Sequence, residues 1–353
     1  MTASPFDHAF LSGLLGDEET GACLTAEADV AAMVRFERAL AEAEGAEGVV
    51  PSEAAEAIAA AATSFVPDMA LLREGMRRDG VVIPELVRQL RAAVGEPHAR
   101  FVHHGATSQD AIDTSLSLRL GAVFDILAAR LARTVEALDL LARRDGGRRV
   151  MAHTRMQAAL PVAAARKIAG WRDPLVRHQA RLVSVRGHVG VLHFGGPVGS
   201  LEGLGDKADA VVKRLAAALG LVPPHRPRHS ERDAPAELAS WLSLVTGSLG
   251  KMGQDVALLA QSEVAEIRLA SGGGSSAMAH KVNPVAAELL VTLARFNATL
   301  VAGMHQSLVH ENERSGAAWT LEWMVLPQMI MAAGVSLSTA ERLVGEIAFH
   351  ATA

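Results

Sequence analysis

The strongest constraint on the fold is a run of apolar side chains at steps of four and three along residues 238–259. Its members are Leu238, Leu242, Val245, Leu249, Met252, Val256 and Leu259. This spacing predicts a helix that packs nearly parallel to its neighbours with a left-handed crossing. A similar stripe runs over residues 116–138, before Asp145-Gly146-Gly147 ends that helix. Both stripes predict long bundle helices.

Comparable helical segments are expected over residues 155–190, 284–309 and 319–344, which gives at least five helices in one central bundle. No strand-like alternation is long enough to support a sheet. Hydrophobic residues make up 50% of the chain and aromatic residues only 4%, as expected for helices rich in alanine and leucine. We therefore predict an all-α fold.

The positions of the prolines predict the domain organisation. Residues 1–105 contain shorter predicted helices separated by Pro51, Pro67 and Pro84, which indicates a small N-terminal helical domain. Residues 106–353 are expected to form the central long-helix bundle domain, which carries a glycine-rich loop at 271–284. The proline-rich stretch 221–235 is predicted to be an irregular, exposed connection between bundle helices.

Charge and composition exclude several classes of function. The formal net charge is −5 and no long basic stripe occurs, which argues against a nucleic-acid partner. Residues 1–10 lack the pattern of a signal peptide, and no uninterrupted apolar run reaches about 18 residues, so we expect a cytoplasmic protein without membrane contact. Cys23 is the only cysteine, which excludes an internal disulfide. His225 and His229 lie in a proline-broken segment, so neither a metal nor a cofactor is expected.

Residues 271–284, with the sequence SGGGSSAMAHKVNP, place glycines, serines, a lysine and an asparagine between two predicted long helices. The glycines free the backbone to open and close as an active-site lid. A plain connector is the alternative interpretation. Gly272 to Ala277 fits the pattern G-x-G-x-x-A, but it follows a helix and no βαβ unit surrounds it, which excludes a dinucleotide site. Lys281 is one of only five lysines, so general solubility does not explain it.

Residues 274–284 resemble the loop signature of the fumarase/aspartase superfamily, G-S-S-x-M-P-x-K-x-N-P, with Ala279 in place of the proline. The resemblance implies a helical fold in which the long helices of four subunits form a common core. It also implies a homotetramer whose active sites each combine segments from three subunits. The chain ends soon after the last predicted bundle helix, so the small C-terminal domain of the family is expected to be truncated.

The same resemblance implies roles for five residues of the loop. Ser275 would transfer the proton, and its alkoxide would need oriented amides and a nearby cation, because a free serine is far too weak a base. Lys281 and Asn283 would stabilise the enediolate that forms beside a carboxylate. Ser276 and Met278 would contact the substrate.

A second segment, residues 101–110, places histidines and hydroxyl groups where a long helix is expected to begin. Its form H-x-G-A-T-S-Q-D-x-x-D-T is similar to that of the 3-carboxy-cis,cis-muconate cycloisomerase branch of the superfamily. By that resemblance Thr107 and Ser108 bind a substrate carboxylate, with His103 beside them. The alternative is a structural helix cap, in which Thr107 or Ser108 caps the helix and Asp110 complements its dipole. Both roles are compatible.

A third segment, residues 153–161, resembles the T-x-x-Q run of the family through Thr154 and Gln157. Arg155 stands where the lyases have histidine. A histidine acid helps an amine or hydroxide to leave, whereas a carboxylate, with its pKa near 4, needs no such help. Arg155 therefore favours lactone formation and would grip an additional anionic group of the substrate. The alternative is a surface arginine on a helix.

A fourth segment, residues 310–327, contains elements similar to the H-E-R and E-W-x-x-L-P patterns of the same branch. Arg314 is the expected substrate contact. Trp319 and Trp323 are spaced for packing along one helix face.

Together these resemblances imply an intramolecular lyase that interconverts 3-carboxy-cis,cis-muconate and 4-carboxymuconolactone in protocatechuate (β-ketoadipate) catabolism. The substrate is a small polyanionic carboxylate, and whether its third anionic group is a carboxylate or a sulfonate, as in 3-sulfomuconate, stays open. One alternative is a lyase that releases fumarate, such as an adenylosuccinate lyase. The other is a non-catalytic, crystallin-like helical scaffold, against which the joint presence of Ser275, Lys281 and Asn283 argues.

Overall fold

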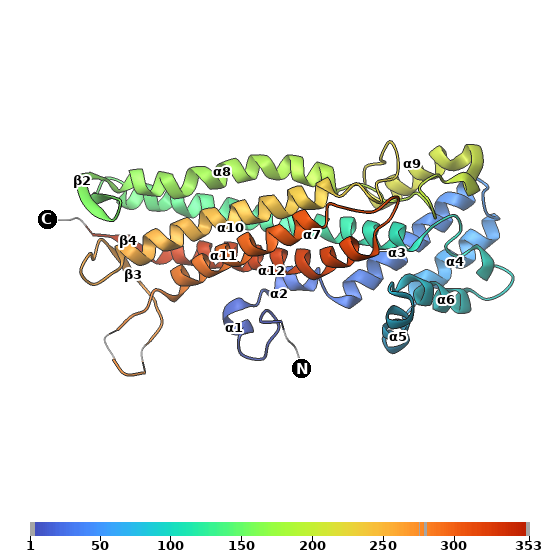
Figure 1. The fold of residues 1–353 in the computed structure, drawn as a ribbon, viewed down its shortest axis with the longest axis horizontal. Coiled ribbons are helices and arrows are strands. Elements are labelled where there is room, and N and C mark those ends of the chain that lie inside the picture. Colours follow the sequence, from blue (N-terminus) through green and yellow to red (C-terminus); the bar gives the residue numbers. More distant parts are fainter. Residues whose placement is uncertain (1–3, 275, 279–280, 351–353) are drawn as a thin grey trace.

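The computed structural model describes residues 4–274, 276–278 and 281–350. Five long helices lie side by side along the long axis of the molecule (Figure 1), and together they enclose a continuous apolar core. These helices are α7 (Ser108–Asp145), α8 (Ala164–Val189), α10 (Asp233–Leu259), α11 (Val285–Gln306) and α12 (Gly316–Glu346). The predicted helical bundle is therefore confirmed.

The apolar stripe of residues 238–259 lies along α10 and faces this core. None of its seven side chains is more than 5% exposed. Helix α10 packs most closely against α11, because its glycines leave room for the neighbouring backbone. A Cβ atom at Gly253 would lie only 2.5 Å from the carbonyl oxygen of Ala287. Helix α7 ends at Gly146, as its sequence predicts.

Shorter helices precede the bundle, as the prolines of this region predict. Asp68 caps α5 by accepting hydrogen bonds from two backbone amides, and Pro84 lies in the first turn of α6. A second apolar core joins these helices to α9 and to the start of α7. The domain boundary at residue 105 stays a prediction. The elements are α1 (Ser12–Leu15), α2 (Glu18–Ala22), α3 (Ala26–Ala46), α4 (Ser52–Ser64), α5 (Met69–Asp79), α6 (Ile83–Val94), α9 (Ala208–Leu219) and the 3-10 turns Ala99–Phe101 and Glu202–Lys207.

Two small antiparallel sheets correct the prediction that the chain contains no sheet. Strands β1 (Arg149–Thr154) and β2 (Gln157–Ala163) form a hairpin, so the helix expected from residue 155 begins only at Ala164. The turn residues Arg155 and Met156 have φ values of 49° and 67°, which is the left-handed geometry of a two-residue hairpin turn. Strands β3 (Ile267–Leu269) and β4 (Ile347–Phe349) pair beside the end of the bundle.

The connection between α9 and α10 is irregular, as predicted, but the expectation that it is exposed is wrong for two of its residues. His229 is only 5% exposed and Arg232 only 3%. Each is held inside by a buried carboxylate, His229 by Asp110 and Arg232 by Asp113. Contacts with these carboxylates therefore keep both side chains buried, although the surrounding prolines are typical of an exposed segment.

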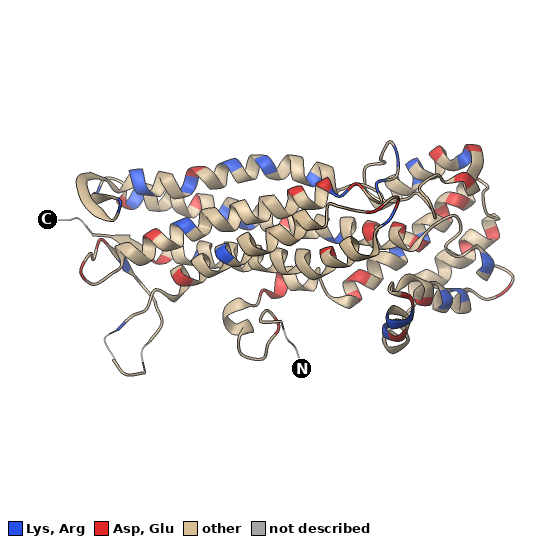
Figure 2. Cartoon of the chain, in the orientation of Figure 1, with Lys and Arg blue, Asp and Glu red and all other residues tan. Residues whose placement is uncertain are grey.

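Helices α11 and α12 are long and apolar enough to cross a membrane by length and composition alone. Helix α12 is mostly buried inside the bundle, whereas α11 leaves most of its apolar length uncovered. Basic and acidic residues are interspersed over most of the described helices, whereas α8 is mainly basic, with Asp173 as its one acidic residue (Figure 2). Half-buried apolar residues of α11 therefore remain at the surface of the chain.

Candidate active site

The residues singled out from the sequence lie at the two ends of α7. At its start, Thr107 caps the helix in a capping box, with its side chain accepting from the backbone of Asp110. The carboxylate of Asp110 accepts in return from the Thr107 amide at 2.9 Å. The structural cap that the sequence offered as an alternative is therefore present. It leaves Ser108 at the first helical position, with its amide in the first turn.

Asp110 is also the centre of a buried hydrogen-bond cluster that the sequence did not predict. Its side chain accepts from the backbone amides of Gly195 and Gly196, each at 2.9 Å, and lies 2.6 Å from Nε2 of His229. The carboxylate is fully buried. It therefore ties the turn at Gly195 and the connection at His229 to the segment that carries Thr107.

Arg314 joins the same end of the molecule from the segment before α12. Its Nε donates to Oε1 of Gln109 at 2.8 Å, and its Nη2 donates to the carbonyl oxygen of Pro197 at 3.2 Å. Gln109 in turn donates to the carbonyl oxygen of His229 at 2.8 Å. Arg314 is thus held against Gln109, the residue that follows Thr107 and Ser108 in the chain. The predicted joint role of these residues in binding an anion requires such a placement.

A buried ion-pair network lies one turn further along α7. Arg232 donates to Asp113 at 2.7 Å and to Glu322 of α12 at 2.5 Å, and the indole of Trp319 donates to Asp113 at 3.0 Å. Burial favours the neutral acid at Asp113, but the charge of Arg232 outweighs it and holds the pKa of Asp113 below its usual value. Two acids at the start of an otherwise buried helix, with no basic residue nearby in the sequence, were the signal that a buried cation was needed.

His103 and His104 precede the helix and pair with glutamates of α3. His103 Nδ1 lies 2.6 Å from Glu37, and His104 Nδ1 lies 3.0 Å from Glu44. Burial disfavours the charged imidazolium of His103, but Glu37 outweighs burial and raises the pKa of His103. Burial also raises the pKa of Glu44 to about 7, although His104 acts in the opposite direction. These two contacts therefore tie the segment before Thr107 to α3.

The β1–β2 hairpin, which follows the other end of α7, carries the third segment. Thr154 and Gln157 are paired across the turn, which places their side chains on one face. Arg155 occupies the turn itself and is exposed. The alternative of a surface arginine on a helix is therefore right about exposure and wrong about the helix. The hairpin thus presents all three side chains outward.

The glycine-rich loop leaves the bundle at the same end. Gly273 and Asn283 exchange two backbone hydrogen bonds, at 2.9 Å and 2.8 Å, and Asn283 Nδ2 donates to the carbonyl oxygen of Gly274 at 3.4 Å. A Cβ atom at Gly272 would overlap Val282 and lie 2.8 Å from the carbonyl oxygen of Asn283. Glycine at 272 is therefore needed for the close backbone pairing, whereas the predicted mobility of the loop stays a prediction.

Three of the loop side chains singled out from the sequence are exposed. Lys281, Ser276 and Met278 are exposed. Ser275, the predicted proton-transfer residue, and Ala279 lie outside the described residues. Among the described residues, no three histidine, cysteine, aspartate or glutamate side chains are grouped as metal ligands would be.

Short contacts fix the loop and hairpin to the C-terminal end of α7. The amide of Phe349 in β4 donates to Asp145 at 3.1 Å, and β4 pairs with β3, which leads into the loop. Helix α7 has 38 residues and therefore spans about 57 Å. Thr107, Ser108 and Arg314 lie at one end of this span, and Arg155, Lys281 and Asn283 lie at the other. Within one chain these two groups do not meet.

Comparisons with known proteins agree with this architecture. A family model described as Lyase matches residues 18–298. The 3-carboxy-cis,cis-muconate cycloisomerase of Bradyrhizobium diazoefficiens is 39% identical over 338 residues, which cover 93% of this chain and 75% of that protein. The 3-carboxy-cis,cis-muconate lactonizing enzyme of Pseudomonas putida superposes with a TM-score of 0.90 at 35% identity, covering 97% of this chain and 77% of that one.

A fumarate lyase from Mesorhizobium sp. BNC1 superposes with a TM-score of 0.88 at 34% identity, covering 94% of this chain and 76% of that one. The chain thus spans about three quarters of the length of these relatives. The match in fold confirms the predicted long-helix bundle.

Proposed function

This chain belongs to the fumarase/aspartase superfamily, and from that premise we propose that it is a cycloisomerase that closes 3-carboxy-cis,cis-muconate to a carboxymuconolactone. The observation that carries the proposal is the hairpin turn, which presents Arg155 between Thr154 and Gln157. An arginine at this point binds an anionic group but cannot act as the proton donor that a poor leaving group requires.

The proposed reaction rearranges bonds without loss of atoms. One substrate carboxylate oxygen forms a bond to a carbon of the conjugated diene, and the displaced π electrons move into the adjacent carboxylate as an enediolate. Lys281 and Asn283 stabilise this charge, and the Ser275 hydroxyl gives its proton to the carbon, which completes the lactone. In reverse, the Ser275 alkoxide removes the proton and the carboxylate leaves.

Binding of the polyanion divides between the two ends of α7. Thr107 and Ser108 offer hydroxyl groups and a helix N-terminus to one carboxylate, with Arg314 held beside them by Gln109. Arg155 binds a second anionic group with its planar guanidinium. The guanidinium of Arg155 can donate two parallel hydrogen bonds to the oxygens of a sulfonate as well as to those of a carboxylate. Arg155 therefore fits either group of the substrate.

We further propose that the active site is shared between chains of a homotetramer. Two observations support this. The proposed binding and catalytic groups lie at opposite ends of α7, and half-buried apolar residues of α11 remain at the surface of the chain. Antiparallel association of the long helices brings the start of α7 in one chain to the hairpin and loop of others.

Mixed assemblies test the shared site. Two inactive variants, Thr107→Val and Ser275→Ala, are unfolded, mixed in equal amounts and refolded together. If Thr107 and Ser275 of one site come from different chains, about one quarter of the sites combine two intact segments and recover activity. Each variant refolded alone is the control. Absence of recovery in the mixture, with native assembly size, contradicts the sharing of sites.

An ultraviolet assay with 3-carboxy-cis,cis-muconate tests the reaction itself. Loss of the conjugated diene, with a carboxymuconolactone identified by NMR, is the expected result, and 3-sulfomuconate is the next substrate to compare. The competing function is that of a fumarate-releasing lyase, which one superposed relative names. Failure to convert the muconate, together with fumarate release from adenylosuccinate, would move the chain to that function.

A further inference from the structure

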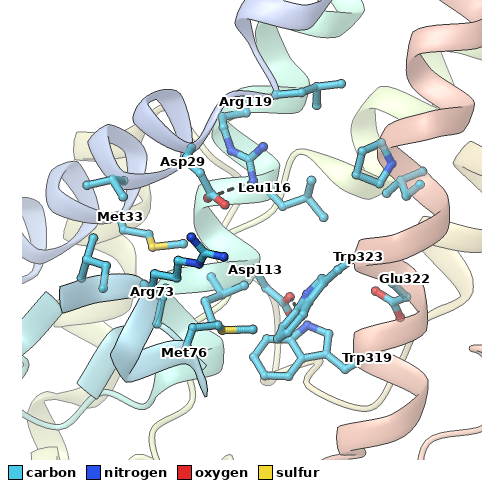
Figure 3. A pocket seen from close by; sticks show the side chains of 18 of the residues that line it. Asp29, Met33, Arg73, Met76, Asp113, Leu116, Arg119, Trp319, Glu322 and Trp323 are labelled. Atoms are coloured by element: carbon cyan, nitrogen blue, oxygen red, sulfur yellow. Dashed lines mark hydrogen bonds and ion pairs between the residues drawn. The ribbon is translucent and has the colours of Figure 1, made fainter. Parts of the chain in front are cut away.

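A cavity of about 420 Å³ lies between α3, α5, α7 and α12 (Figure 3), and its lining includes none of the residues proposed for the reaction. Its volume falls within the range of small-molecule sites, roughly 300–1,000 Å³. Most of its wall is apolar, and Met33, Met76 and Trp323 surround its centre. Flat aromatic rings bind well between indole and thioether groups.

The floor of this cavity is polar, and its carboxylates are already bound by an arginine. Asp113 and Glu322 line it, and both carboxylates are bound by Arg232. Trp319 packs edge-on against Trp323, with the ring centroids 4.7 Å apart, and its indole N–H donates to Asp113. Two carboxylates share one arginine, so the floor repels the charged end of an anionic ligand and accepts its apolar end.

The rim carries the opposite charge. Figure 3 shows the guanidinium of Arg73, on α5, directed into the cavity between Met33 and Met76. Arg73 has no ion-pair partner within the described parts of the chain, whereas Arg119, also on the wall, is paired with Asp29 at 2.9 Å. One arginine is thus available at the mouth of an aromatic cavity.

We propose that this cavity is a second binding site, which takes a small planar aromatic carboxylate. The ring lies against Trp323 between Met33 and Met76, and the carboxylate accepts a forked pair of hydrogen bonds from Arg73 at the rim. The acidic floor fixes this orientation, because the reverse pose would bring the carboxylate toward Asp113 and Glu322. The site is independent of the proposed reaction.

Benzoate is the probe that tests the site, with quenching of tryptophan fluorescence and isothermal titration as the two measurements. Trp319 and Trp323 line the cavity, whereas the other two tryptophans are buried in the bundle core. Benzoate is expected to bind the parent chain with a Kd on the order of 0.1–1 mM. Benzamide, which has the same shape without the charge, should bind at least roughly tenfold more weakly.

Two variants of α5 complete the test. Arg73→Gln should weaken benzoate binding at least roughly tenfold, since it removes a charge-assisted hydrogen-bond pair. Arg77→Gln is the matched control, because Arg77 lies on the same helix and does not line the cavity, and it should change Kd by less than about twofold. Both side chains are exposed, so both variants should fold, which circular dichroism checks. Equal affinity of Arg73→Gln and parent, or of benzamide and benzoate, or no binding at about 10 mM benzoate, overturns the proposal.

Discussion

Replacing Arg232 with methionine removes the guanidinium that joins the carboxylates of α7 and α12. The guanidinium donates to Asp113 at 2.7 Å and to Glu322 at 2.8 Å and 2.5 Å, and the side chains of all three residues are 2% exposed. Breaking one buried ion pair costs about 3–5 kcal/mol, because the remaining charge is left uncompensated. Two carboxylates lose their partner here, so we expect a loss near the upper end, about 5 kcal/mol.

The loss should depend on pH in a definite direction. In the parent, the pKa of Asp113 lies below its usual value despite burial, because of Arg232, so its contribution to stability is present above the unfolded-state pKa and lost as pH falls through the folded-state value. In Arg232→Met, burial becomes the dominant influence and raises the pKa of Asp113, although the hydrogen bond from Gln109 acts in the opposite direction. The folded variant then binds protons that the unfolded chain releases, so its stability falls as pH rises. The deficit should be smaller at about pH 5 than at about pH 8.

Urea unfolding, followed by far-ultraviolet circular dichroism at one fixed protein concentration, measures this deficit. Arg226→Met is the matched control, because Arg226 lies in the same connection with a side chain that is 78% exposed and should cost less than about 0.5 kcal/mol. Adding Asp113→Asn and Glu322→Gln to Arg232→Met should restore part of the stability. A deficit below about 1 kcal/mol, or one that is equal at both pH values, would refute the reasoning.

Three further predictions concern single residues. Ser275→Ala should lower kcat by roughly 10²–10⁴-fold with little change in KM, and full turnover in steady-state assays would exclude Ser275 as the proton-transfer residue. Gly272→Ala should lower kcat at least roughly tenfold, because its Cβ meets Val282 and Asn283. Gly274→Ala is the control that should remain near parental activity, because a Cβ there meets nothing within 4 Å. Equal rates for the two variants would contradict the close-pairing argument. Burial raises the pKa of Glu44 to about 7, so the stability from its protonation is full below about pH 4.5 and lost as pH rises through 7. Glu44→Gln should therefore melt higher than the parent at about pH 8 and gain much less at about pH 5, and the opposite order in thermal melts would be inconsistent with that sign.

The bundle could be predicted because each long helix repeats one local rule. The stripe on α10 needs only apolar side chains at steps of four and three, and all seven of them face the core. The hairpin before α8 could not be predicted in this way. Every residue of β2 except Val162 is exposed, so no alternation between buried and exposed side chains marks the strand, and its turn at Arg155 lacks the usual Asn-Gly sequence.

The candidate site was predictable as segments but not as contacts. Resemblance to the family's motifs singled out Thr107 and Arg314, whereas the partners that orient them depend on tertiary pairing. His229 reaches Asp110 across 119 positions, and Arg232 reaches Asp113 across the same separation. A proline-rich stretch is typical of the surface. Nothing local in this one indicates that two of its side chains contact buried carboxylates of α7.

If the proposed sharing of sites between chains holds, the length of α7 makes protein concentration a determinant of specific activity. A chain whose proposed binding and proton-transfer groups are held about 57 Å apart has no complete site when it is alone. Dilution below the dissociation constant of the assembly should therefore abolish turnover in chains that remain folded. With shared sites, a chain that carries a defective loop should also inactivate sites whose other residues come from intact chains.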